Sequence, residues 1–201
     1  MPGALITTFG VGELSALNGI GGAYSEYVPI IHIVGTTARS AQKDRLMIHH
    51  TLAEDWDHTT LQDVSRPLCA ASVFLTDDST FTQEVDLVME VCIKTRRPVY
   101  LYVPMDTPDL LVDAGRLQNP LDVTVTNPGR EALEDSIVRK IIDEVERAER
   151  PCILVDALTQ RFGLTDDVRE MLRVTGLPVG GVPDQTPVTI FFTTVTVPNF
   201  S

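Results

Sequence analysis

The sequence of 201 residues predicts an α/β fold built on a parallel sheet. Short apolar, β-branched runs at 4–9 and 29–35 suit buried strands, and segment 13–27 between them carries apolar residues at helical spacing. A second strand, helix and strand follow at 70–75, 80–95 and 98–103. Because this order favours right-handed crossovers between parallel strands, we expect a three-layer sandwich with helices on both faces of the sheet.

The ends of the later helices are marked by individual residues. Thr80 and Gln83 have the spacing of a capping box at the start of the helix that ends near Thr95. Beyond a Pro-, Asp- and Asn-rich stretch come a helix with one apolar face (133–145) and a strand (152–155). A further helix is predicted between Thr165, as its N-cap, and Gly176, just past its end. The sequence therefore predicts a second, incomplete α/β unit.

The charge and the apolar content of the sequence limit the classes of molecule that the protein can bind. A formal net charge of -12 repels phosphate backbones and anionic lipids, which argues against nucleic acid and membrane partners. No run of about 18 apolar residues is present. The three cysteines form no CxxC pair, so we interpret them as buried thiols of a cytoplasmic protein.

Two short patterns are candidate sites. The Gly10-Val11-Gly12 turn follows a strand, where parallel sheets bind ligands, and glycines let the backbone approach a flat ring. On the local pattern alone a plain turn is the better explanation, because a lone GxG is not specific. The neighbouring His49 and His50 point in different directions and do not form a chelating pair, but imidazoles can transfer protons near neutral pH. One surface and one buried histidine is the alternative.

Acidic residues also surround Trp56. Asp55, Asp57 and His58 are possible metal ligands, or they are part of a solvated loop. A dinucleotide-binding domain is a weaker reading, because it needs an acidic residue after the second strand and Gly35-Thr36-Thr37 stands there.

Taken together, these segments resemble the thiamine-diphosphate-dependent 2-keto-acid decarboxylases of the fungal pyruvate decarboxylase type. The resemblance is carried first by residues 6–20, Ile-Thr-Thr-Phe-Gly-Val-Gly-Glu-Leu-Ser-Ala-Leu-Asn-Gly-Ile. The pair His49-His50 and the strands near 97–104 and 151–157 extend it, from about Leu5 to Pro178. It implies a fragment made of the end of the pyrimidine-binding domain (1–106), a linker (107–129) and the start of the central domain (130–180). Residues 181–201 depart from the family, and our hypothesis is a misread intron or frameshift.

The resemblance also implies residue roles. His49 and His50 would be catalytic proton-handling residues, and Thr8, Gly10 and Val11 would lie against the aminopyrimidine ring of thiamine diphosphate.

Two arginines fall where some yeast-type enzymes contact a regulatory pyruvate, Arg97 and Arg161. The regulatory cysteine of those enzymes is Leu158 here, and the histidine that relays its signal is Tyr27. This argues against yeast-type substrate activation.

The activity implied is decarboxylation of a 2-keto acid, pyruvate to acetaldehyde and CO2, by a homodimer or homotetramer. The family's ylide-forming glutamate and its Mg²⁺-binding Gly-Asp-Gly…Asn motif do not occur in this sequence, so we expect the chain alone to be inactive and place the Mg²⁺ site in a C-terminal domain. Indolepyruvate or phenylpyruvate decarboxylase stays open, and so does a non-catalytic paralogue that acts as a regulatory partner.

Overall fold

The computed structural model describes residues 1–52, 54–125, 131–181 and 191–192. Residues 1–125 and 126–201 form two compact units, and each unit is described by itself. No helix within the described ranges is long and apolar enough to cross a membrane.

The first unit is organised around a four-stranded sheet of parallel strands. Its strands are β1 (Gly3–Thr8), β2 (Ile30–Thr36), β3 (Ala71–Phe74) and β4 (Val99–Pro104), in the order β1-β2-β4-β3. All three pairings are parallel, as the sequence predicts. The carboxyl ends of the strands therefore lie along one edge of the sheet.

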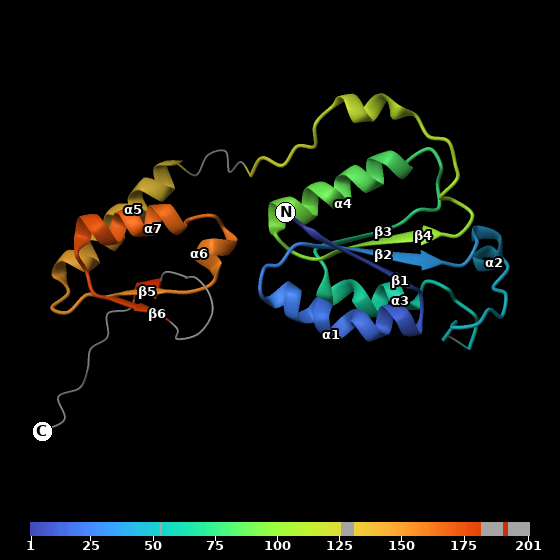
Figure 1. The fold of residues 1–201 in the computed structure, drawn as a ribbon, viewed down its shortest axis with the longest axis horizontal. Coiled ribbons are helices and arrows are strands. Elements are labelled where there is room, and N and C mark those ends of the chain that lie inside the picture. The colour runs from blue at the N-terminus through green and yellow to red at the C-terminus, as the bar shows by residue number, and fades with distance from the viewer. Residues whose placement is uncertain (53, 126–130, 182–190, 193–201) are drawn as a thin grey trace, which may run out of the picture. The chain divides into compact units, whose positions relative to one another are not determined.

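Helices cover both faces of this sheet, which confirms the predicted three-layer α/β class (Figure 1). Helix α1 (Val11–Ser25) lies on one side with α3 (Thr60–Ser65), and α4 (Phe81–Thr95) lies on the other. The core beneath α1 centres on Ile20, Val34, Tyr100 and Tyr102. The core beneath α4 centres on Val88, Cys92 and Val99.

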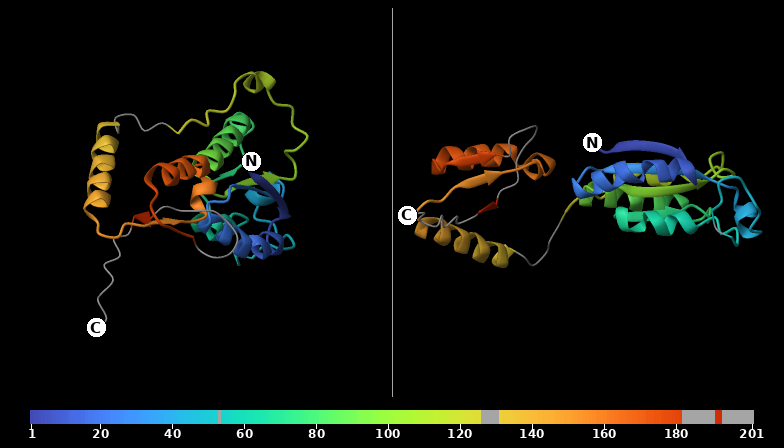
Figure 2. Two further views of the ribbon diagram at one scale, coloured as in Figure 1. Left: turned by 60° about the vertical axis from the view of Figure 1, so that its left-hand side comes forward. Right: turned by 90° about the horizontal axis from the view of Figure 1, so that it is seen from below.

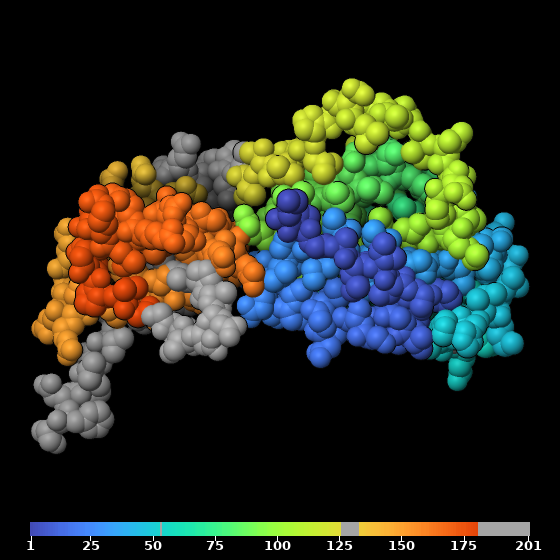
Figure 3. Space-filling view, viewed as in Figure 1, coloured from blue at the N-terminus to red at the C-terminus, as the bar shows by residue number. Residues whose placement is uncertain are grey.

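The prediction that β1 is a buried strand is wrong. β1 is an edge strand that pairs with β2, and Ile6 is 73% exposed. The reason is that α4 packs against β2, β3 and β4, so no helix among the described residues of this unit covers the side of β1 that carries Ile6. In the space-filling view the darkest blue atoms, from the start of the chain, lie at the surface (Figure 3).

Two predicted helix caps also differ from the structure. Thr80 is the N-cap of α4, but its hydroxyl donates to the Asp77 carbonyl and the Glu84 carboxylate, so no capping box with Gln83 forms. Thr165 is the first residue of α7 (Thr165–Thr175), and Leu164 is the N-cap. Gly176 ends α7 at φ 60°, as predicted.

Several short elements were not expected. They are α2 (Arg39–Lys43), α6 (Leu158–Arg161), the 3-10 turns η1 (Arg66–Leu68) and η2 (Ala114–Gln118), and α3. Each has three to six residues. Segments this short show no clear period of apolar residues, which is the main signal for a helix in a sequence.

The second unit holds a smaller sheet. Strands β5 (Ile153–Val155) and β6 (Val179–Gly181) pair in parallel, and β7 (Phe191–Phe192) is antiparallel to β5. Helix α5 (Glu131–Arg147) and α7 accompany them, and the two views of Figure 2 show that α5 does not lie against α7. Several apolar side chains of α5 are accordingly about half exposed. Residues 188–197 are β-branched and apolar in sequence, and they lie outside the described residues except for β7.

Candidate functional site

The turn between β1 and α1 depends on a glycine. Gly10 is the N-cap of α1 with φ 72° and ψ -122°, a conformation that residues with a side chain rarely adopt. A Cβ atom on Gly10 would lie 2.6 Å from the Cβ of His50 and 2.8 Å from its carbonyl oxygen. The turn backbone therefore lies directly against His50, about forty positions later in the sequence.

The two neighbouring histidines lie together at this turn. The ring centroids of His49 and His50 are 3.9 Å apart, and Phe9 meets His50 edge to face at 6.0 Å. His49 is exposed and His50 is half-buried. His50 has φ 77°, a strained conformation of the kind that gathers at functional sites. The structure thus brings both predicted proton-handling residues to the predicted glycine turn.

Thr8 and Val11, the other predicted cofactor contacts, flank the turn and are exposed, Val11 by 51%. A Cβ atom on Gly12 would lie 2.8 Å from the γ-methyl of Thr8, so the second glycine also keeps the turn close to the strand end. Thr8, Val11 and the backbone between them carry no charge, which suits a flat heterocyclic ring.

Polar contacts hold the loop that carries the histidines. Arg45 pairs with Asp55 at 2.6 Å and with Asp57 at 3.7 Å. His58 lies 2.7 Å from the Thr37 hydroxyl through Nδ1 and 3.0 Å from the Leu46 carbonyl through Nε2.

The side chains of Asp55, Asp57 and His58 are therefore engaged in ion pairs and hydrogen bonds that hold the loop. Hydrogen bonds from Thr59 lower the pKa of the Asp57 carboxyl, and the nearby Arg45 adds to this effect. No group of side chains among the described residues is arranged to hold a metal ion. Of the two readings of this segment, a loop built on ion pairs fits the geometry.

A buried polar cluster beneath the turn was missed by sequence reasoning. Glu13 is 1% exposed, and its Oε1 accepts a 2.8 Å hydrogen bond from the Tyr102 hydroxyl. The Ser65 hydroxyl lies 2.7 Å from the Tyr102 oxygen. Burial raises the pKa of Glu13, against a smaller lowering by hydrogen bonds from Tyr102 and Gly10. The one available signal was an acidic residue in a helix that carries no other charge.

The predicted regulatory arginines lie in different units. Arg97 lies between two aromatic rings, its guanidinium carbon 4.2 Å from the Tyr24 ring centroid and 3.8 Å from that of Tyr27. It also donates a hydrogen bond to the Tyr24 carbonyl, so it fastens the end of α1. Arg161 is the last residue of α6 in the second unit.

Cysteine chemistry is a poor candidate for the first unit. Cys92 is buried as expected, but Cys69 is only half-buried, and so is Cys152 in the second unit, which corrects the prediction of three buried thiols. Burial raises the pKa of Cys69 and of Cys92 to about 11, so neither thiol is ionised near neutral pH.

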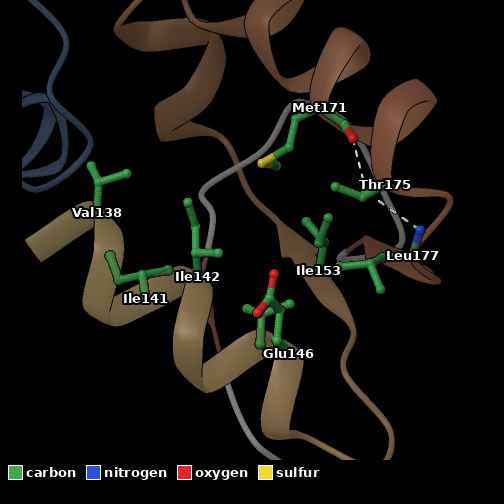
Figure 4. Close-up of a pocket in the computed structure, with 9 residues that line it drawn as sticks. Val138, Ile141, Ile142, Glu146, Ile153, Met171, Thr175 and Leu177 are labelled. Carbon is green, nitrogen blue, oxygen red and sulfur yellow. Dashed lines mark hydrogen bonds between the residues drawn. The ribbon is translucent and has the colours of Figure 1, made fainter. Parts of the chain in front are cut away.

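The second unit has a pocket of about 490 Å³, but it lacks groups for chemistry (Figure 4). Its walls are the aliphatic side chains of α5, β5 and α7, among them Ile141, Ile153 and Met171. Glu146 is the one ionisable side chain in its lining. Because the histidines and the glycine turn are in the first unit, we take the turn as the candidate site.

Comparisons with known proteins agree with this choice. Residues 1–61, which contain the turn and both histidines, match the family described as thiamine pyrophosphate enzyme, N-terminal TPP binding domain. The chain is 40% identical over 90% of its length to a protein of Schizosaccharomyces pombe described as a candidate pyruvate decarboxylase. It is 37% identical over 89% of its length to pyruvate decarboxylase isozyme 2 of Saccharomyces cerevisiae. A thiamine metabolism regulatory protein of Saccharomyces cerevisiae is 35% identical over 90% of the chain.

These matches confirm the resemblance to fungal pyruvate decarboxylases that the motifs indicate. The chain spans 31% of the length of each of the two decarboxylase relatives and 29% of the regulatory protein.

Proposed function

We propose that this chain, which is similar to fungal pyruvate decarboxylases over nine tenths of its length, supplies one wall of a thiamine diphosphate site in a 2-keto-acid decarboxylase. The contact between Gly10 and His50 carries the proposal. This contact places the imidazoles that a proton-transfer reaction needs beside a glycine turn whose backbone can approach a ring.

Each residue of the site has a proposed role. Thiamine diphosphate, when bound, supplies the electron sink for loss of CO2. The backbone of Gly10 lies against its aminopyrimidine ring, with Thr8 and Val11 beside it. His49 and His50 give protons to, or take them from, the substrate side of the site.

The remaining assignments follow from the relatives. Pyruvate is the proposed substrate, because relatives in yeasts are pyruvate decarboxylases. Indolepyruvate and phenylpyruvate are the alternatives among enzymes. We assign the Mg²⁺ that holds the diphosphate to the part of the relatives' length that this chain does not span. On this proposal the assembly is a cytoplasmic homodimer or homotetramer, and the chain alone is inactive.

We propose the same domain division as before: a pyrimidine-binding part at 1–106, a linker at 107–129, the start of a central domain at 130–180 and a divergent tail at 181–201. Arg97 and Arg161 remain the proposed contacts of a regulatory substrate, while Leu158 and Tyr27 argue against activation by the yeast-type route.

A regulatory role is the second candidate. The observation that favours it is the 35% identity to a thiamine metabolism regulatory protein, nearly as high as the identity to the decarboxylase isozyme. Such a protein could use the same turn to bind the cofactor without decarboxylating a keto acid.

A chimera separates the two functions. We would replace the matching segment of pyruvate decarboxylase isozyme 2 with residues 1–178 of this chain and measure CO2 release from pyruvate. Activity that depends on His50 is the result expected of an enzyme. A folded chimera that binds thiamine diphosphate and releases no CO2 would favour the regulatory candidate.

A titration of the 201-residue chain tests the cofactor site itself. Thiamine diphosphate is expected to shift the NMR resonances of His49, His50 and the Gly10 amide, with no change in the second unit. If thiamine diphosphate at millimolar concentration leaves the resonances of both histidines and of Gly10 unchanged, the proposed cofactor wall is wrong.

A further inference from the structure

We propose that Glu13 is a positioning residue whose buried carboxyl, held by Tyr102, fixes the Gly10 turn against His50. The inference rests on the proposed function, because its consequence for catalysis depends on the turn being the cofactor wall. Its structural part concerns contacts within this chain and can be tested without the cofactor.

The first link is the cap of α1. Gly10 has no side chain to cap the helix. Burial raises the pKa of the carboxyl of Glu13, the third residue of α1, and the backbone amide of Gly10 lowers that pKa by a smaller amount. Glu13 thus stands at the position from which the acidic residue of a capping box reaches back to the N-cap. The Gly10 carbonyl accepts from the Leu14 N–H at 2.9 Å, so the first turn of α1 holds the backbone of Gly10 directly.

The second link ties the carboxyl to the sheet. Tyr102 lies in β4, which has β2 on one side and β3 on the other, and donates to Glu13 at 2.8 Å. Its ring stacks on Phe74 at 5.2 Å and its oxygen lies 2.7 Å from the Ser65 hydroxyl of α3. Groups held by packed strands and helices are positioned more tightly than groups on loops. The Gly10 turn thus takes its position from the sheet.

The third link is the protonation state of Glu13. Its Oε2 has no hydrogen-bond partner among the described residues, and burial raises its pKa. Tyr102, Tyr100, His32 and Cys69 lie in the cluster or pack beside it, and none of these four supplies a positive charge near neutral pH. A carboxylate here would be a buried charge without an ion-pair partner in the described part of the chain, and burial therefore favours the neutral acid.

The sign of the pH effect follows from this. The folded state holds the proton of Glu13 more tightly than the unfolded state, whose carboxyl has the usual value of 4.5. The contribution of protonated Glu13 to the free energy of unfolding is therefore complete below pH 4.5. It is lost as the pH rises through the higher pKa of the folded state.

The test compares two tyrosines on the same face of β4 in the 201-residue chain. Tyr102→Phe removes the hydroxyl that holds Glu13, and Tyr100→Phe, the matched control, removes a buried hydroxyl with no hydrogen-bond partner among the described residues. We expect Tyr102→Phe to lower the hydrogen-exchange protection of the Gly10 amide about tenfold, the effect of one lost hydrogen bond. It should also shift the imidazole resonances of His50, whereas Tyr100→Phe should change neither.

Two variants of Glu13 separate positioning from simple filling of the core. Glu13→Gln keeps an oxygen for Gly10 and Tyr102, so it should retain the protection of the Gly10 amide and lose its pH dependence above 4.5. Glu13→Leu should lose the protection at every pH.

Two results would contradict the positioning role of Glu13. Equal effects of Tyr102→Phe and Tyr100→Phe would overturn the inference, and so would a Gly10 amide that responds while His50 does not. If Gly10 and His50 both respond but thiamine diphosphate never binds, the positioning role stands and the proposed function fails.

Discussion

Gly10 is the residue on which the candidate site depends most directly, because a side chain there would collide with His50. We expect Gly10→Ala to lower the free energy of unfolding by about 1–3 kcal/mol, from backbone strain and steric overlap, and to displace His50. Urea unfolding followed by the fluorescence of Trp56, the single tryptophan, measures the change in the first unit. NMR of His50 reports the displacement.

Gly19→Ala is the matched control for this change. Gly19 lies within α1 and has no atom within 4 Å of an added Cβ, so alanine there should stabilise the unit by roughly 0.5–1 kcal/mol. If the two variants have the same stability, the close contact between Gly10 and His50 does not exist in solution.

Among single residues, the sequence predicted those that line the turn and missed the buried residues beneath it. Gly10, His49 and His50 belong to local patterns that can be recognised along the chain. The contact between Glu13 and Tyr102 joins residues 89 positions apart, and no local pattern in the sequence links the two. Such a pair becomes visible only when the strand order places β4 beneath α1.

Among the elements, the strands show that a local sequence pattern predicts a strand but does not predict its burial. The runs that became β1 and β2 are both largely apolar and β-branched, yet β2 is central and β1 lies at the edge. Apolar content predicts a strand, but burial depends on which strands and helices lie beside it. The long helices α4 and α5 were predictable because their apolar periods run over several turns.

The central position of β2 makes stability depend on pH through His32. This residue is fully buried, and burial lowers its pKa from the usual 6.5 to about 4. The unfolded chain takes up a proton below pH 6.5 and the folded chain does not until about pH 4. Acidification across this window should therefore cost up to about 3 kcal/mol of stability, and no more below it.

The variant His32→Gln isolates this contribution, because glutamine keeps a polar atom for the Thr7 hydroxyl that lies 2.9 Å from His32 Nε2. Urea unfolding at pH 7, 6, 5 and 4 should show a smaller loss in the variant than in the wild type. His49→Gln, at an exposed imidazole, serves as the control. A wild-type loss no larger than that of His32→Gln would show that His32 titrates normally.

On the scale of the whole molecule, the exposed edge of the sheet should govern how the chain associates. β1 pairs with β2 on one side and carries Ile6 at 73% exposure, and an apolar edge strand of this kind promotes contacts between chains. We expect the 201-residue chain to self-associate as its concentration rises, and Ile6→Lys to shift it towards monomer. Light scattering coupled to size-exclusion chromatography measures both.

The control must be an exposed apolar residue that lies away from the edge strand. Leu111, fully exposed between β4 and η2, meets this condition, so Leu111→Lys adds the same charge without changing β1. If Leu111→Lys reduces association as much as Ile6→Lys does, the net charge of the chain controls self-association and the edge strand β1 does not. If only Ile6→Lys acts, the edge of β1 is the surface through which this unit meets another polypeptide. A longer chain or a partner subunit that covers β1 would then protect Ile6 from solvent.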